Sequence, residues 1–150
     1  MNDETERAET ATPQVEEAQA EQGSPLLFDL PTLAHFREKS LSTQIVLDSG
    51  TARVVLFAFK AGQQLKEHQT TSQILVQVVH GEITFTTPSH SKNMQAGMLL
   101  QLEASIPHSI VAQTDAVVLV TMLPSPTYHS LEQEVFQALT PLATRSHKKS

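Results

Sequence analysis

The feature that most limits the possible folds of this chain is a series of short apolar and β-branched segments between residues 43 and 123. Gly, Pro, Asn, Asp or Ser separates each segment from the next, and these residues are typical of tight turns. About eight closely spaced strands predict an all-β domain, either a closed barrel or two packed sheets, because separate sheet edges would be exposed. The expected strands cover residues 43–47, 52–60, 73–80, 82–86, 92–95, 98–102, 108–112 and 117–123.

The segments on either side of these strands have a different composition. Residues 1–24 hold seven acidic residues, one basic residue and no aromatic side chain, so we expect a disordered acidic tail. Residues 25–42 form an N-terminal arm that begins with an apolar patch and includes a short helix or turn over residues 32–37. Residues 124–150 are expected to form a short C-terminal helix, capped by Ser130, and then a basic tail.

Composition excludes several classes of function. The chain has no cysteine, which rules out disulfides, thiolate metal sites and a cysteine nucleophile. The net charge of −6 falls on the acidic tail, so the remaining residues 25–150 are formally neutral and lack the basic surface that nucleic-acid binding needs. The N-terminus does not resemble a signal peptide, and no apolar run approaches the roughly 18 residues of a membrane-spanning helix. We therefore expect a cytoplasmic protein without a membrane partner.

Two histidines form the one pattern that suggests chemistry. His68 lies between Gly62 and Gly81, and His108 follows Gly97 within the segment Ile-Pro-His-Ser-Ile. Other chemistries have less support, because the chain has no Gly-x-Ser-x-Gly nucleophile motif and no evident pair of carboxylates for glycoside hydrolysis. The two histidine segments are therefore the candidate site.

Taken with the strand pattern, these segments resemble the small single-domain cupins, the RmlC-like proteins. The first motif of that family has Gly, five residues, His-x-His, three or four residues, Glu, six residues and Gly. The second has Gly, five residues, Pro-x-Gly, two residues and His. The resemblance covers residues 52–123 and implies a double-stranded β-helix, or jelly-roll, barrel that forms a homodimer. The matching positions in this chain are Gly62, His68, Gly81, Gly97 and His108.

This chain departs from the family motifs mainly at the metal ligands. Thr70 stands where the family has its second histidine, and Ile74 stands where it has its glutamate. Glu103 and Ser105 replace the proline and glycine of the second motif, which shape a turn. The resemblance therefore predicts the barrel with a degenerate metal site, in which two of four ligands remain.

A catalytic zinc or non-haem iron usually takes at least three protein ligands, so the two histidines would need a third donor. Gln73, Glu103 and Thr70 are the candidates. Gln73 is one residue from the family's acidic position, and a shift of one residue at the start of the strand would turn it inward. We therefore name His68, His108 and Gln73 as candidate ligands of a weakly bound divalent metal, with Zn, Fe, Mn and Ni as the alternatives.

Three functions are consistent with these observations. The first is a small cupin-fold protein whose polar cavity, around the two histidines, binds a small molecule or weakly binds a metal. The second is a metal-dependent cupin enzyme, of the dioxygenase or sugar-modifying isomerase type, with Gln73 or Glu103 as the replacement ligand. The third is a non-catalytic interaction protein that uses the acidic tail and the C-terminal helix. The positions of Gln73 and Glu103 relative to the histidines distinguish the first two.

Overall fold

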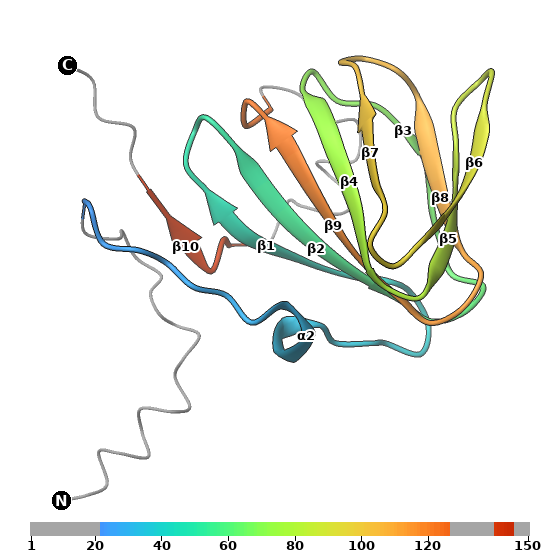
Figure 1. The fold of residues 1–150 in the computed structure, drawn as a ribbon, viewed down its shortest axis with the longest axis horizontal. Helices are drawn as coiled ribbons and strands as arrows, with labels where there is room; N and C mark the ends of the chain where they lie inside the picture. The colour runs from blue at the N-terminus through green and yellow to red at the C-terminus, as the bar shows by residue number, and fades with distance from the viewer. Residues whose placement is uncertain (1–21, 127–139, 146–150) are drawn as a thin grey trace, which may run out of the picture.

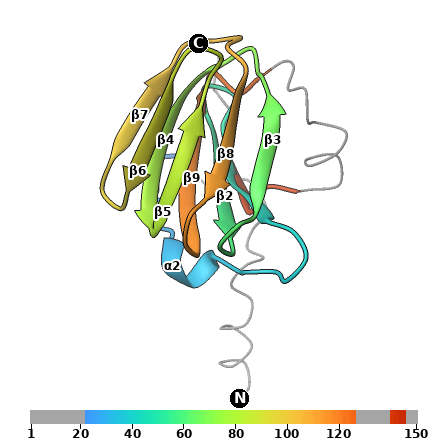
Figure 2. The same cartoon turned by 90° about the vertical axis from the view of Figure 1, so that its right-hand side faces the viewer.

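The structure, a computed structural model, describes residues 22–126 and 140–145. Two β-sheets face each other and curve into a barrel (Figures 1 and 2). The six-stranded sheet has the order β10-β1-β2-β9-β4-β7, and the four-stranded sheet has the order β3-β8-β5-β6. This arrangement confirms the predicted all-β jelly-roll fold. The strands are β1 (Ser42–Asp48), β2 (Arg53–Phe59), β3 (Gln64–His68), β4 (Gln73–His80), β5 (Glu82–Thr86), β6 (Ser91–Gln95), β7 (Leu99–Leu102), β8 (His108–Ala112), β9 (Ala116–Leu123) and β10 (Ala143–Thr144).

Eight of these strands lie within one residue of the predicted bounds, but β3 and β10 were not predicted. In β3, Leu65 and His68 are buried whereas Lys66 and Glu67 between them are exposed. The cause is a β-bulge, since the register with β8 shifts by one residue between Leu65 and His68. The bulge interrupts the alternation of buried and exposed side chains, which is the pattern that identifies a strand in a sequence. Strand β10 has only two residues, which is too short for a pattern.

The core lies between the two sheets and follows from the alternation of side chains along each strand. The inward residues of the central strands are aliphatic or aromatic, and several are fully buried. Burial of a side chain of this size stabilises the fold by about 1.5–3 kcal/mol. The largest of these buried side chains include Phe59, Phe85, Ile83, Ile110 and Val118.

The N-terminal arm covers part of the outer face of the six-stranded sheet, where a second apolar cluster forms around Val46, Leu56 and Val117. The arm contains one helix turn, α2 (Leu30–Leu33), which lies beside the sheet in Figure 1. This helix starts and ends earlier than the predicted residues 32–37. The side chain of Asp29 caps its N-terminus by accepting a hydrogen bond from the backbone N–H of Thr32, at 3.3 Å.

The turn from β4 to β5 carries the chain from one sheet to the other and depends on Gly81. This residue has a φ of +83°, and a Cβ built there would lie 2.1 Å from the carbonyl oxygen of Asp115. Only glycine fits such a position, because both its φ and the lack of space exclude a side chain.

Both ends of the described body meet at one edge of the six-stranded sheet. Strand β10 pairs in parallel with β1, and the Arg145 guanidinium donates a hydrogen bond to the carbonyl of Ser24 at 2.8 Å. No helix within residues 22–126 and 140–145 is long and apolar enough to cross a membrane. The predicted C-terminal helix that begins at Ser130, and most of the acidic tail, lie outside the described residues.

Candidate functional site

His68 and His108 come together at one end of the four-stranded sheet. His68 is the last residue of β3, His108 is the first residue of β8, and the two are paired across these antiparallel strands. Their ring centroids lie 4.2 Å apart with an angle of 62° between the ring planes. Both side chains are buried, with 7% and 4% of their surfaces exposed. The structure therefore brings together the two histidines that the sequence singled out.

Backbone features aim the two rings inward. The bulge in β3 sends Lys66 and Glu67 outward and returns His68 to the inside of the barrel. Ahead of β8, Ser105 has a φ of +66°, and its N–H donates a hydrogen bond to the carbonyl of Thr70 at 2.9 Å. Ser105 occupies the position of the glycine in the second family motif. The turn thus keeps a conformation that favours glycine although the glycine is absent.

A hydrogen bond to the backbone defines the tautomer of each imidazole. Nδ1 of His68 lies 2.7 Å from the carbonyl oxygen of Lys66, and Nδ1 of His108 lies 2.8 Å from that of Ile106. A carbonyl oxygen only accepts, so both Nδ1 atoms carry the proton and the lone pair is on Nε2 in both rings. An imidazole in this form can ligate a metal through Nε2, with the carbonyl as the partner that orients the ring.

Burial keeps both histidines neutral at pH 7. The pKa of His68 is lowered to about 4, mainly by burial and also by the nearby His108, whereas the hydrogen bond to the carbonyl of Lys66 acts in the opposite direction. Burial also lowers the pKa of His108, while the carbonyl of Ile106 and the carboxylate of Glu67 oppose the shift. In addition, the ring of Phe85 stacks on that of His108, with 5.5 Å between the centroids.

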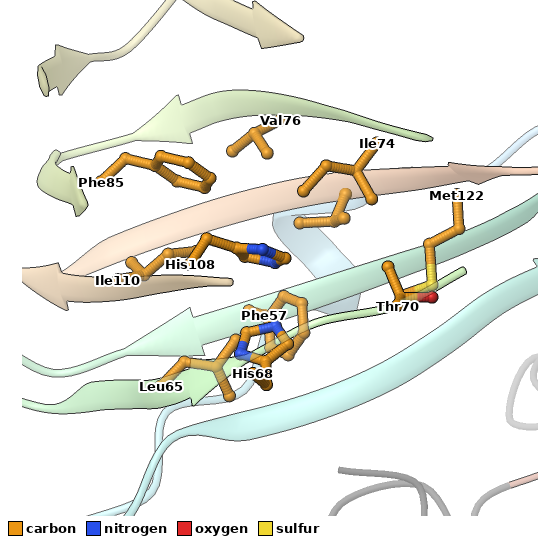
Figure 3. Close-up of a pocket in the computed structure, with 11 residues that line it drawn as sticks. Phe57, Leu65, His68, Thr70, Ile74, Val76, Phe85, His108, Ile110 and Met122 are labelled. Atoms are coloured by element: carbon orange, nitrogen blue, oxygen red, sulfur yellow. The ribbon is translucent and has the colours of Figure 1, made fainter. Parts of the chain in front are cut away.

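The two imidazoles face a very small cavity inside the barrel (Figure 3). It leaves about 10 Å³ for the centre of a water molecule, roughly the space of one water. Pockets that bind drug-sized ligands have volumes of about 300–1,000 Å³, so this cavity fits one water-sized body rather than an organic substrate. The lining residues are Phe57, Leu65, His68, Thr70, Ile74, Val76, Phe85, His108, Ile110, Val120 and Met122.

The structure does not place Gln73 with the histidines. Its side chain is exposed and accepts a hydrogen bond at 3.1 Å from the amide of Gln101 on the neighbouring strand β7. The reason is the register of β4, in which Ile74 points into the cavity and the residue before it must point out. Glu103 is also exposed and does not line the cavity. Among the three candidates for a third ligand, only Thr70 lines the cavity.

The donor set does not fit a tightly held catalytic metal. Within the part of the chain that the structure describes, no group of three His, Cys, Asp or Glu residues could hold a metal ion. The cavity provides two imidazoles and a hydroxyl, and its lining has no carboxylate. A catalytic zinc site has three strong protein ligands, so this site has one too few.

Sequence reasoning missed Met122 as a functional candidate. This residue of β9 is 2% exposed, lines the same cavity as the histidines and pairs directly with Ile74 of β4. The alternation along β9 puts Val118, Val120 and Met122 on the inside, a pattern visible in the sequence. A buried methionine in an apolar strand, however, is indistinguishable from ordinary core until its neighbours are known.

No model of a known protein family matches the sequence, and no curated protein matches it. Solved structures do match. An RmlC-like cupin protein from Desulfovibrio desulfuricans is 29% identical over 67% of this chain and 98% of its own, with a TM-score of 0.64. A protein with a double-stranded β-helix domain from Klebsiella pneumoniae is 14% identical, with a TM-score of 0.65 over 71% of this chain and 96% of its own. A cupin superfamily protein from Desulfitobacterium hafniense is 22% identical, with a TM-score of 0.60 over 69% of this chain and 93% of its own.

Proposed function

Because the chain is a small cupin-type protein, we propose that its barrel binds one small ligand between His68 and His108, and that this ligand is a weakly held metal ion. The observation that carries the proposal is the pair of hydrogen bonds from Nδ1 to backbone carbonyls, which puts the lone pair on Nε2 in both buried rings. The volume of the cavity supports an ion, since it holds a single water-sized body.

The same features explain why binding is weak. Two neutral imidazoles compensate none of the charge of a divalent ion, and the residues that line the cavity include no carboxylate. Neutral imidazoles have no proton to lose before they bind a metal, which favours binding at pH 7. Among the divalent ions expected from the sequence, the usual order of affinity places nickel and zinc above iron and manganese.

The alternative function as a metal-dependent enzyme has less support. It requires Gln73 or Glu103 to complete the ligand set, and both side chains lie outside the cavity. It also requires space for a substrate beside the metal, whereas the cavity holds about one water. Binding without catalysis is therefore the function that the site supports best.

Calorimetric titration of the untagged full-length chain with Zn²⁺ and Ni²⁺ tests this proposal. We expect one site per chain, and we expect His68→Ala and His108→Ala each to remove the binding. His80→Ala is the matched control, since His80 ends β4 but is exposed and does not line this cavity. The proposal is wrong if no ion binds, or if His80→Ala weakens binding as much as the two buried substitutions do.

A further inference from the structure

A second cavity, which we call the arm pocket, lies on the outer face of the six-stranded sheet. It has a volume of about 180 Å³ and forms between β1, β2 and the N-terminal arm. Its most buried lining residues are Leu56 and Ala58 of β2, and Leu33 and Ala34 of the arm pack beside them. Phe57, between Leu56 and Ala58, lines the histidine cavity instead, so the two cavities lie on opposite faces of β2.

The exposed part of the arm pocket is basic. His35 and Arg37 line it from the loop between α2 and β1, and both side chains are exposed. Among the described residues, no acidic side chain lines the pocket, and the Arg37 guanidinium forms no ion pair. The neighbouring carboxylate of Glu38 lies 3.6 Å from Nζ of Lys60, a residue outside the pocket lining. The charge of Arg37 is therefore available to an anionic ligand.

Hydrogen bonds to the backbone hold the loop that carries these basic side chains. The Ser42 hydroxyl donates a hydrogen bond to the carbonyl of His35. The side-chain amide of Gln63 donates hydrogen bonds to the carbonyls of Arg37, at 2.9 Å, and Glu38, at 3.3 Å. All three bonds end on main-chain oxygens, so they fix the loop without engaging the guanidinium. A ligand would then have to order only side chains, which lowers the entropy lost on binding.

The volume and lining of the arm pocket define the chemistry of a matching ligand. An engineered apolar cavity of about 150 Å³ binds benzene, so about 180 Å³ is enough for one six-membered ring. The buried side chains of Leu56 and Ala58 offer an apolar surface to such a ring. A guanidinium recognises a carboxylate through two parallel hydrogen bonds. A ring that carries one carboxylate combines both requirements.

We propose that the arm pocket binds a small organic monocarboxylate, with its ring over Leu56 and Ala58 and its carboxylate on Arg37. This inference goes beyond the proposed metal site, because it concerns another cavity on the other face of β2.

Titration of the ¹⁵N-labelled full-length chain with benzoate, followed by NMR, tests the proposal. We expect saturable shifts of the backbone amides that surround the arm pocket, with a dissociation constant of about 1 mM or below. Benzamide has the ring without the charge, and acetate has the charge without the ring. Each is expected to bind at least about tenfold more weakly than benzoate.

Arg37→Met removes the charge and is expected to weaken benzoate binding about tenfold. Arg37→Lys keeps the charge but loses the paired hydrogen bonds, and is expected to weaken binding about threefold. Lys39→Met is the matched control, because Lys39 is an exposed cation of the same loop that does not line the pocket. Both positions are exposed, so neither substitution should disturb folding.

Four results would overturn the proposal. The first is the absence of a saturable shift with benzoate. The second is binding of benzamide or acetate as tight as that of benzoate. The third is an equal loss of benzoate affinity in Lys39→Met and Arg37→Met. The fourth is a set of shifts centred on His68 and His108, which would place the ligand in the histidine cavity.

Discussion

The two walls of the cavity differ in chemistry although they belong to one barrel. The four-stranded sheet provides both imidazoles, His68 from β3 and His108 from β8. The facing six-stranded sheet contributes only apolar groups and one thioether, from β2, β4 and β9. Both imidazole nitrogen donors of the cavity therefore come from the four-stranded sheet.

This difference shows that the backbone fold and the set of metal ligands in the cavity depend on different residues. The two sheets of this barrel have the fold of solved cupin structures, such as the RmlC-like cupin protein from Desulfovibrio desulfuricans. The ligands present are set by single residues such as Ile74, which lies in β4 and points into the cavity. The predictions below test whether the two walls are independent in this way.

The largest effect is expected from placing a carboxylate on the apolar wall. Ile74→Glu should lower the free energy of unfolding of the metal-free chain by about 4 kcal/mol, because it removes buried aliphatic packing and buries a polar group. Zn²⁺ should then bind about 100-fold more tightly, as a third strong ligand appears. Denaturant unfolding and calorimetry measure both quantities. Ile74→Gln is the control, and an equal gain of zinc affinity with Gln would contradict the explanation.

The two glycine turns that connect the sheets should lose different amounts of stability when the glycine is replaced by alanine. Gly81 turns the chain from β4 to β5 and Gly97 from β6 to β7, both with positive φ. Gly81→Ala should cost about 3 kcal/mol, because its Cβ would overlap the backbone of Asp115. Gly97→Ala has open space around it and should cost about 1 kcal/mol, from its φ alone. Thermal and denaturant unfolding compare the two, and equal losses would show that space plays no part.

Low pH should destabilise the protein through the two buried histidines of the four-stranded sheet. Well above pH 6.5 both the folded and the unfolded His68 are neutral, so the group has no effect on stability there. As the pH falls from 6.5, the unfolded chain takes up a proton, but the folded chain resists until its pKa of about 4. Stability is lost across that window, by up to about 3 kcal/mol for His68. His108 acts in the same direction, since its pKa is also lowered.

Unfolding free energies of wild type and His68→Leu at pH 7, 5.5 and 4 test this prediction. The variant lacks the titrating group and should lose less stability than wild type over the same range. Ile74→Val, on the opposite wall, should follow the wild-type pH dependence because it changes no titratable group. Parallel curves for wild type and His68→Leu would refute the assignment.

The smallest expected effect is at the turn that leads into β8. Ser105→Gly should stabilise the protein by about 0.5 kcal/mol, because glycine adopts a φ of +66° without strain but loses more entropy on folding. Ser105→Ala retains the strain and should bring no gain. Chemical denaturation at pH 7 resolves the difference, and a loss of stability with glycine would show that the serine side chain has another role.

Much of the barrel could be predicted because eight strands alternate and end at turn residues. Strand β3 could not, since its bulge places Lys66 and Glu67 on the same side. The two histidines could be found from their spacing to glycines. Gln73 could not be placed without the register of β4, and Met122 could not be separated from core residues without the cavity. Local pattern therefore predicted the scaffold, whereas the donor set depends on pairings across strands.

The edge where β10 joins β1 has a consequence for how the chain can be reconnected. Arg145 contacts Ser24, so the two ends of the described body are neighbours. Figure 1 places this edge and the four-stranded sheet at opposite sides of the molecule. A circularly permuted chain that links residue 145 to residue 22 and opens at the exposed Pro88 turn would interrupt no strand. The sequence order of the strands could therefore change while their arrangement in the barrel stays the same, and both histidines would remain in place.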